Sequence, residues 1–262
     1  MTTTRISVKS NDTAVEMSVS TYGEGRPVLL LHGGAGPQSM TGFAEQLADA
    51  HRVNALVPTH PGFGGTDRPS TLIGIRSLAE LYDDLIDALD LHEVTIIGNS
   101  IGGWLTAELA LLKSPRIGDI VLIDAVGIEV PGHPVADFFS MTMNEVFSRS
   151  FHNPEPFRVD PASMPPEAQA VAAGNRAALA AYAGESMSDP TLVARLSSLT
   201  VPALVLWGAS DQIVDAEYGR AYARAIPTAQ FELLTETGHS PQLETPAQVL
   251  KALNGKALHP RR

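Results

Sequence analysis

The stretch Gly-Asn-Ser-Ile-Gly at positions 98–102 decides how the chain is interpreted, because it matches the pattern G-x-S-x-G between a predicted strand and a predicted helix. The apolar run Val94–Ile97 precedes it, and a helical pattern follows from Gly103 to Leu112. A serine in a sharp strand-to-helix turn is held in a strained conformation that projects its hydroxyl from the sheet's C-terminal edge. Small residues at positions 98 and 102 let this turn close, and the helix N-terminus favours negative charge there. The stretch therefore predicts that Ser100 is a nucleophile.

A serine hydroxyl is a poor nucleophile near neutral pH, so we expect a base nearby. His239 is the best-placed histidine, because it follows the strand-like run Ala229–Leu234 in a loop before the last predicted helix. The base needs a carboxylate that fixes its tautomer and stabilises its charged form. Asp211 follows the strand-like run Pro202–Trp207, which gives the chain order serine, aspartate, histidine. We expect Ser100, Asp211 and His239 to act together.

Two other acids compete with Asp211 for the place beside the histidine. Asp124 ends an earlier predicted strand and could reach the same imidazole from a neighbouring position. Asp215 is more simply explained as the cap of the helix that follows it. The sequence prefers Asp211 and keeps Asp124 as the alternative acid.

Acyl transfer also needs N–H donors for the oxyanion of a tetrahedral intermediate. The backbone N–H of Ile101, directly after the nucleophile, is one candidate. The second is expected in the glycine-rich loop after the first apolar strand, where we choose Gly34 and keep Gly33 and Ala35 as alternatives. His32 in this loop is expected to support it by hydrogen bonding and to take no part in proton transfer.

Short apolar runs alternate with amphipathic stretches along most of the chain, which predicts an α/β fold with a mostly parallel sheet covered on both faces. The expected strands are Val28–His32, Arg52–Pro58, Val94–Gly98, Asp119–Asp124, Pro202–Trp207 and Ala229–Leu234, with an antiparallel hairpin of Ile6–Val8 and Ala14–Ser20 around Ser-Asn-Asp at the edge. Expected helix starts are the Ser77/Glu80 capping box before Leu81–Leu89, Asp215 before Ala216–Ile226, and Thr245-Pro246 before Ala247–Leu253.

Residues 126–199 break this rhythm, because they contain no convincing strand and are rich in proline, alanine and methionine. Five of the eight phenylalanines lie between Phe138 and Phe157. We interpret the segment as a helical insertion. Its apolar side chains either form a small core of their own or line an adaptable pocket under a lid.

Composition excludes several classes of function. The 262 residues include 18 basic and 29 acidic side chains, a net charge of −11 that argues against nucleic acid or an anionic membrane as partner. With no cysteine, disulfides, thiol chemistry and cysteine metal sites are excluded. The glycine loop fails the G-x-G-x-x-G spacing, and no zinc motif is present, so we expect neither cofactor nor metal. No targeting segment or membrane span is evident, and a cytoplasmic location is expected.

With these pieces in hand, the sequence resembles the α/β-hydrolase family. The matching segments run in family order and are His32-Gly33-Gly34, Pro61-Gly62-Phe63-Gly64, residues 98–103, Trp207–Asp211 and Gly238-His239-Ser240-Pro241. The resemblance implies an eight-stranded, mostly parallel core with a helical cap inserted after the sixth strand. It thus implies a core of residues 1–125 and 200–262 and a cap of residues 126–199. By the same analogy, Ser100 is the nucleophile, His239 the general base and acid, and Asp211 the orienting acid.

The predicted strand-to-helix turn at residues 98–103 looks like those of carboxylesterases and meta-cleavage-product hydrolases. Several other positions depart from family patterns. Serine at position 100 argues against haloalkane dehalogenases and epoxide hydrolases, which place an aspartate there. The loop at 33–37 reads Gly-Gly-Ala-Gly-Pro, unlike the Gly-Gly-Gly-Pro-Gly of many meta-cleavage hydrolases. His60 stands where many relatives have aspartate and is expected to be a structural turn residue. Arg158 and Arg176 in the cap could neutralise a substrate carboxylate, but solvated arginines are the simpler interpretation.

The expected function is hydrolysis of a small, largely apolar ester, lactone or related acyl compound through an acyl-enzyme on Ser100. The alternatives are a meta-cleavage-type C–C hydrolase, a cofactor-free haloperoxidase or perhydrolase, and a triad-retaining small-molecule receptor. The expected partner is a small-molecule substrate, and the sequence leaves open whether the chain forms a homo-oligomer.

Overall fold

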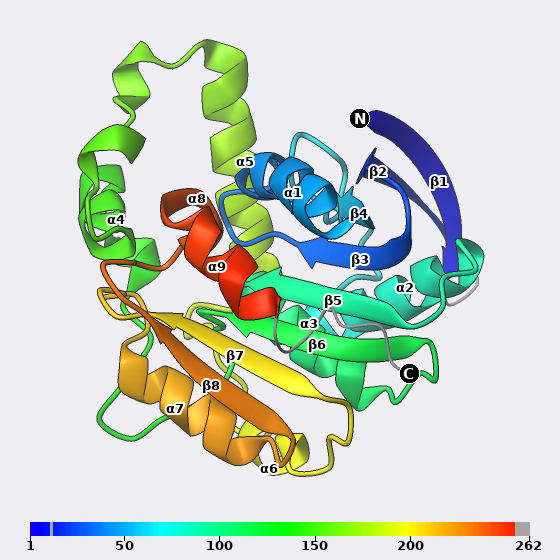
Figure 1. Ribbon diagram of the computed structural model, residues 1–262. Helices are drawn as coiled ribbons and strands as arrows, with labels where there is room; N and C mark the ends of the chain where they lie inside the picture. Colours follow the sequence, from blue (N-terminus) through cyan, green and yellow to red (C-terminus); the bar gives the residue numbers. More distant parts are fainter. Residues whose placement is uncertain (11–12, 255–262) are drawn as a thin grey trace.

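Eight strands form one sheet in the computed structural model, which describes residues 1–10 and 13–254 (Figure 1). The strands are β1 (Thr2–Ser10), β2 (Thr13–Tyr22), β3 (Arg26–Leu31), β4 (Val53–Pro58), β5 (Val94–Asn99), β6 (Ile117–Ile123), β7 (Ala203–Gly208) and β8 (Ala229–Leu234). They lie in the order β1-β2-β4-β3-β5-β6-β7-β8. β2 pairs antiparallel with β1 and β4, and every other neighbouring pair is parallel. The expected α/β fold with a mostly parallel eight-stranded sheet is confirmed.

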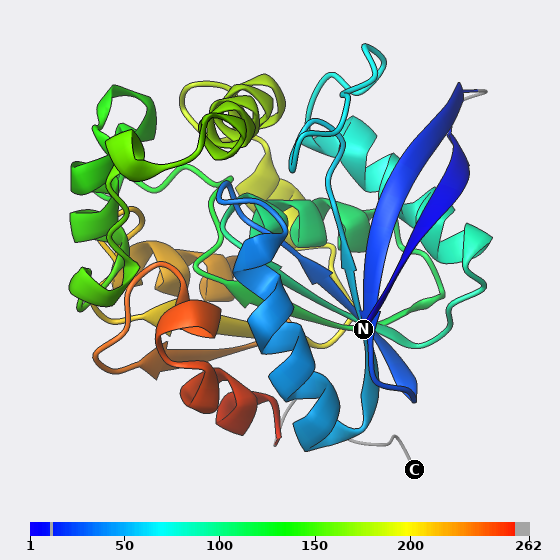
Figure 2. The ribbon, with the colours of Figure 1, turned by 90° about the horizontal axis from the view of Figure 1, so that it is seen from above.

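Both faces of the sheet are covered by helices, which explains why the central strands are continuously apolar. Along β3, Val28 and Leu30 join one core cluster and Leu29 and Leu31 the other, because successive side chains point to opposite faces. The first face is covered by α1 (Gln38–His51) and α9 (Pro246–Leu253); the second is covered by α2 (Ile75–Ala88), α3 (Ile101–Leu111) and α7 (Ala216–Ala225). Figure 2 shows these two layers on either side of the sheet. Residues that act on a substrate are therefore expected at the ends of the strands, because helices cover both faces of the sheet.

The expected edge hairpin is present as β1 and β2, and both strands are longer than predicted. Their buried side chains, which include Val8, Val15 and Met17, pack on the same side as α2. Of the predicted Ser-Asn-Asp turn, Asn11 and Asp12 lie outside the described residues, as do residues 255–262 of the predicted second core segment.

Helix starts were predicted with mixed success. Asp215 caps α7 as expected, because its carboxylate accepts the Tyr218 N–H at 3.0 Å. The prediction for Ser77 was wrong. Helix α2 begins earlier, at Ile75, and Ser77 is the third helical residue, whose hydroxyl accepts from the Gly74 N–H at 3.2 Å. An extended glycine before Ile75 lets the chain enter the helix three residues sooner than the polar pattern indicated.

The segment between β6 and β7 is helical, with no strand beyond an isolated bridge between Gly127 and Ser188. Its elements are the short 3₁₀ turns η1 (Phe138–Ser140), η2 (Glu155–Phe157) and η3 (Pro161–Ser163) and the helices α4 (Met143–Ser150), α5 (Pro166–Ala183) and α6 (Leu192–Leu196). The part from α4 to α5 rises as an arch beyond the C-terminal ends of the parallel strands (Figure 1). Among the described residues, no helix is both long and apolar enough to cross a bilayer.

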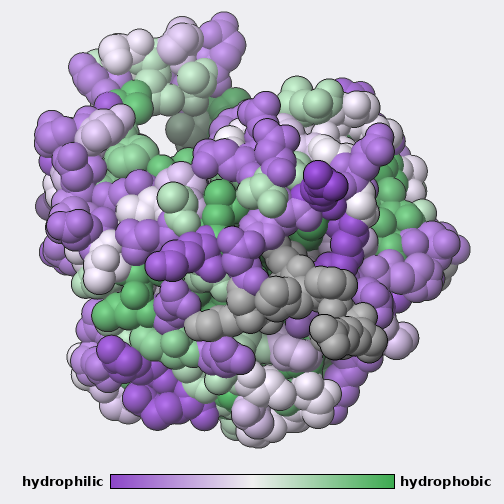
Figure 3. Space-filling view, viewed as in Figure 1, coloured by the Kyte–Doolittle hydropathy of each residue, from purple (hydrophilic) through white to green (hydrophobic). Residues whose placement is uncertain are grey.

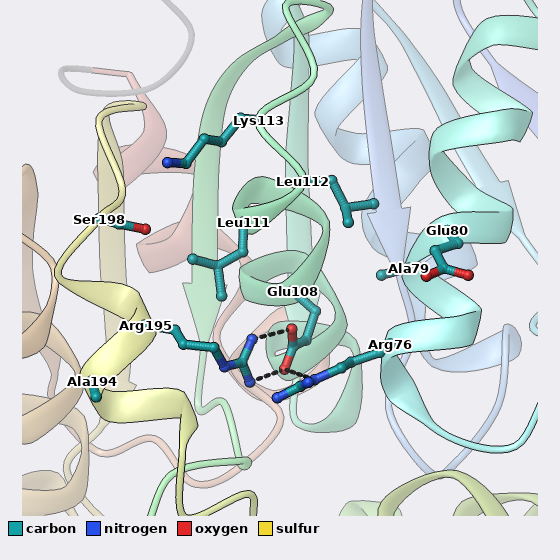
Figure 4. A pocket seen from close by; sticks show the side chains of 10 residues that line it. All are labelled: Arg76, Ala79, Glu80, Glu108, Leu111, Leu112, Lys113, Ala194, Arg195 and Ser198. Carbon is teal, nitrogen blue, oxygen red and sulfur yellow. Dashed lines mark hydrogen bonds and ion pairs between the residues drawn. The ribbon is translucent and has the colours of Figure 1, made fainter.

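A buried carboxylate ties α3 to α6 on the second face of the sheet. Glu108 of α3 has a 4% exposed side chain and accepts two hydrogen bonds of 2.6 Å from the guanidinium of Arg195. Arg195 also pairs with Asp189 at 2.8 Å, and Arg76 lies 3.9 Å from Glu108 (Figure 4). A two-pronged arginine–carboxylate pair of this kind fixes direction as well as charge. The helix that follows Ser100 is therefore held by its far end.

We expect Arg195→Ala to lower the free energy of unfolding by about 3 kcal/mol, because it leaves the Glu108 carboxylate buried without its main partner. Arg76→Ala is the matched control. Its side chain is 60% exposed and its contact with Glu108 is long, so its loss should cost less than about 1 kcal/mol. Urea unfolding monitored by circular dichroism tests this difference, and equal losses in the two variants would contradict it.

Candidate active site

Ser100 occupies a strained turn between β5 and α3. Its backbone has φ 57° and ψ −119°, a region that residues other than glycine rarely adopt. The turn is packed so closely that a Cβ at Gly98 would lie 2.1 Å from the carbonyl oxygen of Gly102, and one at Gly102 would lie 2.2 Å from that of Leu31. The two glycines of the G-x-S-x-G pattern are thus required by backbone contact, and the serine is directed out of the sheet.

The side chain of Asn99 connects this turn to two neighbouring segments. Its Nδ2 donates to the backbone oxygens of Ile123, at the end of β6, and His239, at 3.2 and 2.8 Å. Its Oδ1 accepts from Gln242 Nε2 at 3.1 Å, in α8 (Pro241–Glu244). Asn99 is 3% exposed, so these bonds are shielded from water. The residue before the serine therefore fixes the loop that carries the histidine.

Asp211 and His239 meet directly, although 28 residues separate them. Asp211 Oδ2 accepts from His239 Nδ1 at 2.7 Å, and Asp211 Oδ1 accepts the N–H groups of Ile213 and Val214 at 2.7 and 3.2 Å. A carboxylate can only accept here, so Nδ1 carries the proton and Nε2 is the free, basic nitrogen. This pair is arranged as an orienting acid and a general base.

The alternative acids have other partners. Asp124 lies at the end of β6 and accepts the Gly208 N–H at 2.8 Å, so it is beside the Asp211–His239 pair without taking the imidazole proton. Asp215 caps α7 and accepts from His133 Nδ1 at 2.6 Å. Of the three carboxylates, Asp211 is the one that holds the histidine.

The two backbone N–H groups chosen from the sequence as oxyanion donors are free among the residues that the structure describes. Neither Ile101 nor Gly34 donates its N–H to any other residue in the described part of the chain. Gly33 is the loop residue nearest the serine, since a Cβ there would lie 3.2 Å from Ser100 Cβ, whereas Gly34 packs against Leu179. Within the same residues Ser100 Oγ also makes no hydrogen bond, so the serine is not joined to His239 in this structure. Such contacts are often long until substrate binds.

The glycine loop is supported from below by two buried histidines whose tautomers follow from their partners. The His60 backbone N–H donates to His32 Nε2 at 3.1 Å, so the His32 proton is on Nδ1, which donates to Gly33 O at 2.8 Å. His60 Nε2 donates to His32 O at 3.0 Å, so its Nδ1 accepts from the Tyr82 hydroxyl at 2.5 Å. Burial lowers the pKa of His32 to about 4, so this network is uncharged at neutral pH.

The arch segment contacts the site at several points. Asn175 of α5 donates to Ala35 O at 3.2 Å and accepts from the Gly64 N–H at 2.8 Å, which joins the helix to the glycine loop. At the end of α4, the carbonyls of Arg149 and Ser150 accept from the N–H groups of Gln212 and His239 at 3.0 and 2.6 Å. The arch therefore fixes the loops of both the acid and the base.

The two arch arginines are occupied by neighbours in the segment between β6 and β7. Arg158 bonds Glu155 at 2.8 Å and Ser148 at 2.9 Å. Arg176 donates to the carbonyl oxygens of Phe138 and Phe139 at 3.2 and 2.6 Å, and its guanidinium lies over both rings. In this structure both arginines stabilise the local conformation through hydrogen bonds to neighbouring residues.

Asp124, Asp211 and His239 are the one described group that could present three ligand atoms to a metal, with the atoms within 4.8 Å of one another. The His239 proton already lies between two of them, so a cation would have to break that hydrogen bond. The pocket of about 460 Å³ drawn in Figure 4 is lined by Arg76, Glu108 and Arg195, and none of the three lies next to Ser100 in the chain or in the site. Within it, the carboxylate of Glu108 is paired with the guanidinium groups of Arg76 and Arg195.

Comparison with known proteins agrees with this geometry. A family model described as the alpha/beta hydrolase family matches residues 28–252. The chain belongs to the alpha/beta hydrolase family. It is a hydrolase by this membership, and the resemblance drawn from the sequence is confirmed.

Similar proteins include two kinds of hydrolase. The chain is 27% identical to a 2-hydroxy-6-oxononadienedioate/2-hydroxy-6-oxononatrienedioate hydrolase of Cupriavidus pinatubonensis, over 91% of this chain and 89% of that one. It is 28% identical to a 2-hydroxymuconate semialdehyde hydrolase of Pseudomonas putida, over 85% and 83%. A solved esterase from Thermogutta terrifontis is 25% identical, with a TM-score of 0.77 and coverage of 96% and 97%. The relatives are thus named as an esterase and as hydrolases of two unsaturated oxo compounds.

Sequence reasoning missed three residues that position the site of this hydrolase, namely Asn99, Tyr82 and Asn175. Asn99 was within the quoted motif, and its place beside the serine was a usable signal. Tyr82 and Asn175 read as ordinary helix residues, and only the fold brings them to His60 and to the glycine loop.

We expect Tyr82→Phe to lower the stability of this hydrolase by about 1–3 kcal/mol, because His60 Nδ1 would be buried without a donor. We also expect kcat to fall more than KM rises, since the loop at Gly33 loses support. Tyr22→Phe is the control, because that hydroxyl donates only to the sulfur of Met1. Denaturant unfolding and steady-state kinetics measure both effects. If the two variants had the same stability and the same kinetic constants, the role of Tyr82 in supporting the glycine loop would be refuted.

Proposed function

We propose that this hydrolase cleaves a small, largely apolar ester, lactone or related acyl compound through an acyl-enzyme on Ser100. The observation that carries the proposal is the 2.7 Å bond between Asp211 and His239, at the sheet edge where Ser100 is held at φ 57°. An oriented base and a partly accessible serine are the two parts that nucleophilic acyl transfer needs.

In the proposed mechanism, His239 Nε2 takes the Ser100 hydroxyl proton as the serine oxygen attacks the substrate carbonyl carbon. The N–H groups of Ile101 and Gly34 donate to the developing oxyanion, and Asp211 stabilises the imidazolium. When the tetrahedral intermediate collapses, the imidazolium gives its proton to the leaving alkoxide. Water, deprotonated by His239, then attacks the acyl-enzyme and releases the acid and free Ser100.

We assign residues 126–199 the role of a cap over this site. Its support is the contact of α5 with the glycine loop and of α4 with the loops of Asp211 and His239. Figure 3 shows an opening beneath the arch with hydrophobic surface around it, which suits an apolar substrate. The phenylalanines Phe147, Phe151 and Phe157 stack in the arch, with the last pair of rings 4.2 Å apart.

Hydrolysis of a C–C bond is the second candidate, and the names of the two curated relatives favour it. Against it stand the loop sequence at positions 33–37 and the hydrogen bonds that hold Arg158 and Arg176 to neighbouring residues between β6 and β7. The two candidates share Ser100, Asp211 and His239 and differ in the bond that breaks.

The test is turnover of p-nitrophenyl esters, lactones and vinylogous diketones by wild type and Ser100→Ala. We expect ester hydrolysis, and a loss in kcat of about 10⁴- to 10⁶-fold in Ser100→Ala with the fold intact. Ser210→Ala is the matched control, because that serine adjoins Asp211 but its hydroxyl bonds His152, and the variant should keep wild-type rates.

Wild-type ester hydrolysis by Ser100→Ala would refute the nucleophile. Turnover of diketones alone would replace the ester assignment by C–C hydrolysis.

A further inference from the structure

Asp124 is a buried carboxyl that the proposed mechanism does not use. It is fully buried at the end of β6, with φ 43°. Its Oδ1 accepts one hydrogen bond, from the Gly208 N–H at 2.8 Å. Its Oδ2 receives no N–H or O–H donor from any described residue, although it is shielded from solvent. An ionised carboxylate in this position would lack most of the donors that its charge needs.

The neighbouring Asp211 has the opposite environment. Three donors serve its carboxylate, namely the N–H groups of Ile213 and Val214 and the Nδ1–H of His239. The carboxyls of Asp124 and Asp211 lie close enough to interact, with ligand atoms of both within 4.8 Å of His239 and of each other. Two adjacent carboxylates with no solvent between them cannot both ionise at low cost.

The surroundings of Asp124 favour a proton on it, with one exception. Burial raises its pKa well above the usual value, and the nearby charge of Asp211 raises that pKa further. Glu244 of α8 acts in the same direction, while the Gly208 N–H opposes it. His239 shares its proton with Asp211 rather than with Asp124. A hydrogen bond between two carboxyls requires one of them to be the neutral acid.

We propose that Asp124 is a positioning residue that remains the neutral acid, with its O–H donating to the Asp211 carboxylate. The proposal rests on the proposed function, because Asp211 matters for turnover only if His239 is the base. Asp211 then carries the single negative charge of the pair, in the orientation that keeps the His239 proton on Nδ1.

The sign of the stability effect follows from proton linkage. A neutral Asp124 in the folded protein has its proton bound, whereas the unfolded chain loses it above pH about 4. This group's contribution to stability is therefore fully present below pH 4 and is lost as the pH rises towards its folded pKa. Asparagine has the shape and the N–H donor of the neutral acid but no titration, so Asp124→Asn removes this loss.

The experiment is thermal unfolding of wild type, Asp124→Asn and Asp124→Ala from pH 4 to pH 8. We expect the Tm of Asp124→Asn to match wild type near pH 4 and to exceed it by at least about 3 °C at pH 8. Asp124→Ala should lie below Asp124→Asn at every pH, because it leaves the Gly208 N–H without an acceptor.

A Tm difference between Asp124→Asn and wild type that is flat or falls with rising pH would overturn the proposal. The measurement needs no substrate, so its failure is distinct from a failure of the proposed function, which the Ser100→Ala kinetics decide. With an ester that wild type hydrolyses, kcat should fall far less in Asp124→Asn than in Asp211→Asn, where the loss is expected to be about 10⁴-fold. Equal losses would also count against a neutral Asp124.

Discussion

The close approach of backbone at the turn around Ser100 is the constraint on which the rest of the site depends. No side chain fits at Gly98 or Gly102, so β5 can turn directly into α3 beneath the glycine loop. That turn places Asn99 where its amide reaches both β6 and the carbonyl of His239. The same packing recurs two strands away, where a Cβ at Gly208 would lie 2.1 Å from the backbone oxygen of Gly238. Functional loops are held at one sheet edge because glycine lets their backbones touch.

Much of this arrangement could be predicted from the sequence. Strands buried on both faces are continuously apolar, so the predicted bounds of β3, β5, β6 and β7 lie within two residues of the observed ones. The order of Ser100, Asp211 and His239 then followed from their positions just after strands, since parallel strands bring their C-terminal ends to one edge. Asp215 was recognisable as a cap because capping depends on local sequence.

What could not be predicted depends on contacts between distant segments. The start of α2 was misjudged because a glycine with no side-chain signal entered the helix before Ser77. The support of the glycine loop by His60 and Tyr82 requires α2 to lie beside the loop that follows β4, and no local pattern shows that. The pairing of Asp124 with Asp211 arises from the adjacency of β6 and β7. From the sequence, Asp124 and Asp211 were alternatives for one role. The fold places them side by side with different hydrogen-bond partners.

In the proposed reaction, Ser100 Oγ accepts the acyl group of the substrate while His239 acts as the base that removes the serine proton. Intact-protein mass spectrometry after brief exposure to an excess of a slowly hydrolysed p-nitrophenyl ester, followed by peptide mapping, tests it most directly. The account predicts one acyl adduct per chain, located on the peptide that contains Ser100 and absent from Ser100→Ala and from His239→Ala. Turnover of the ester without any such adduct, or an adduct of equal yield in Ser100→Ala, would contradict it.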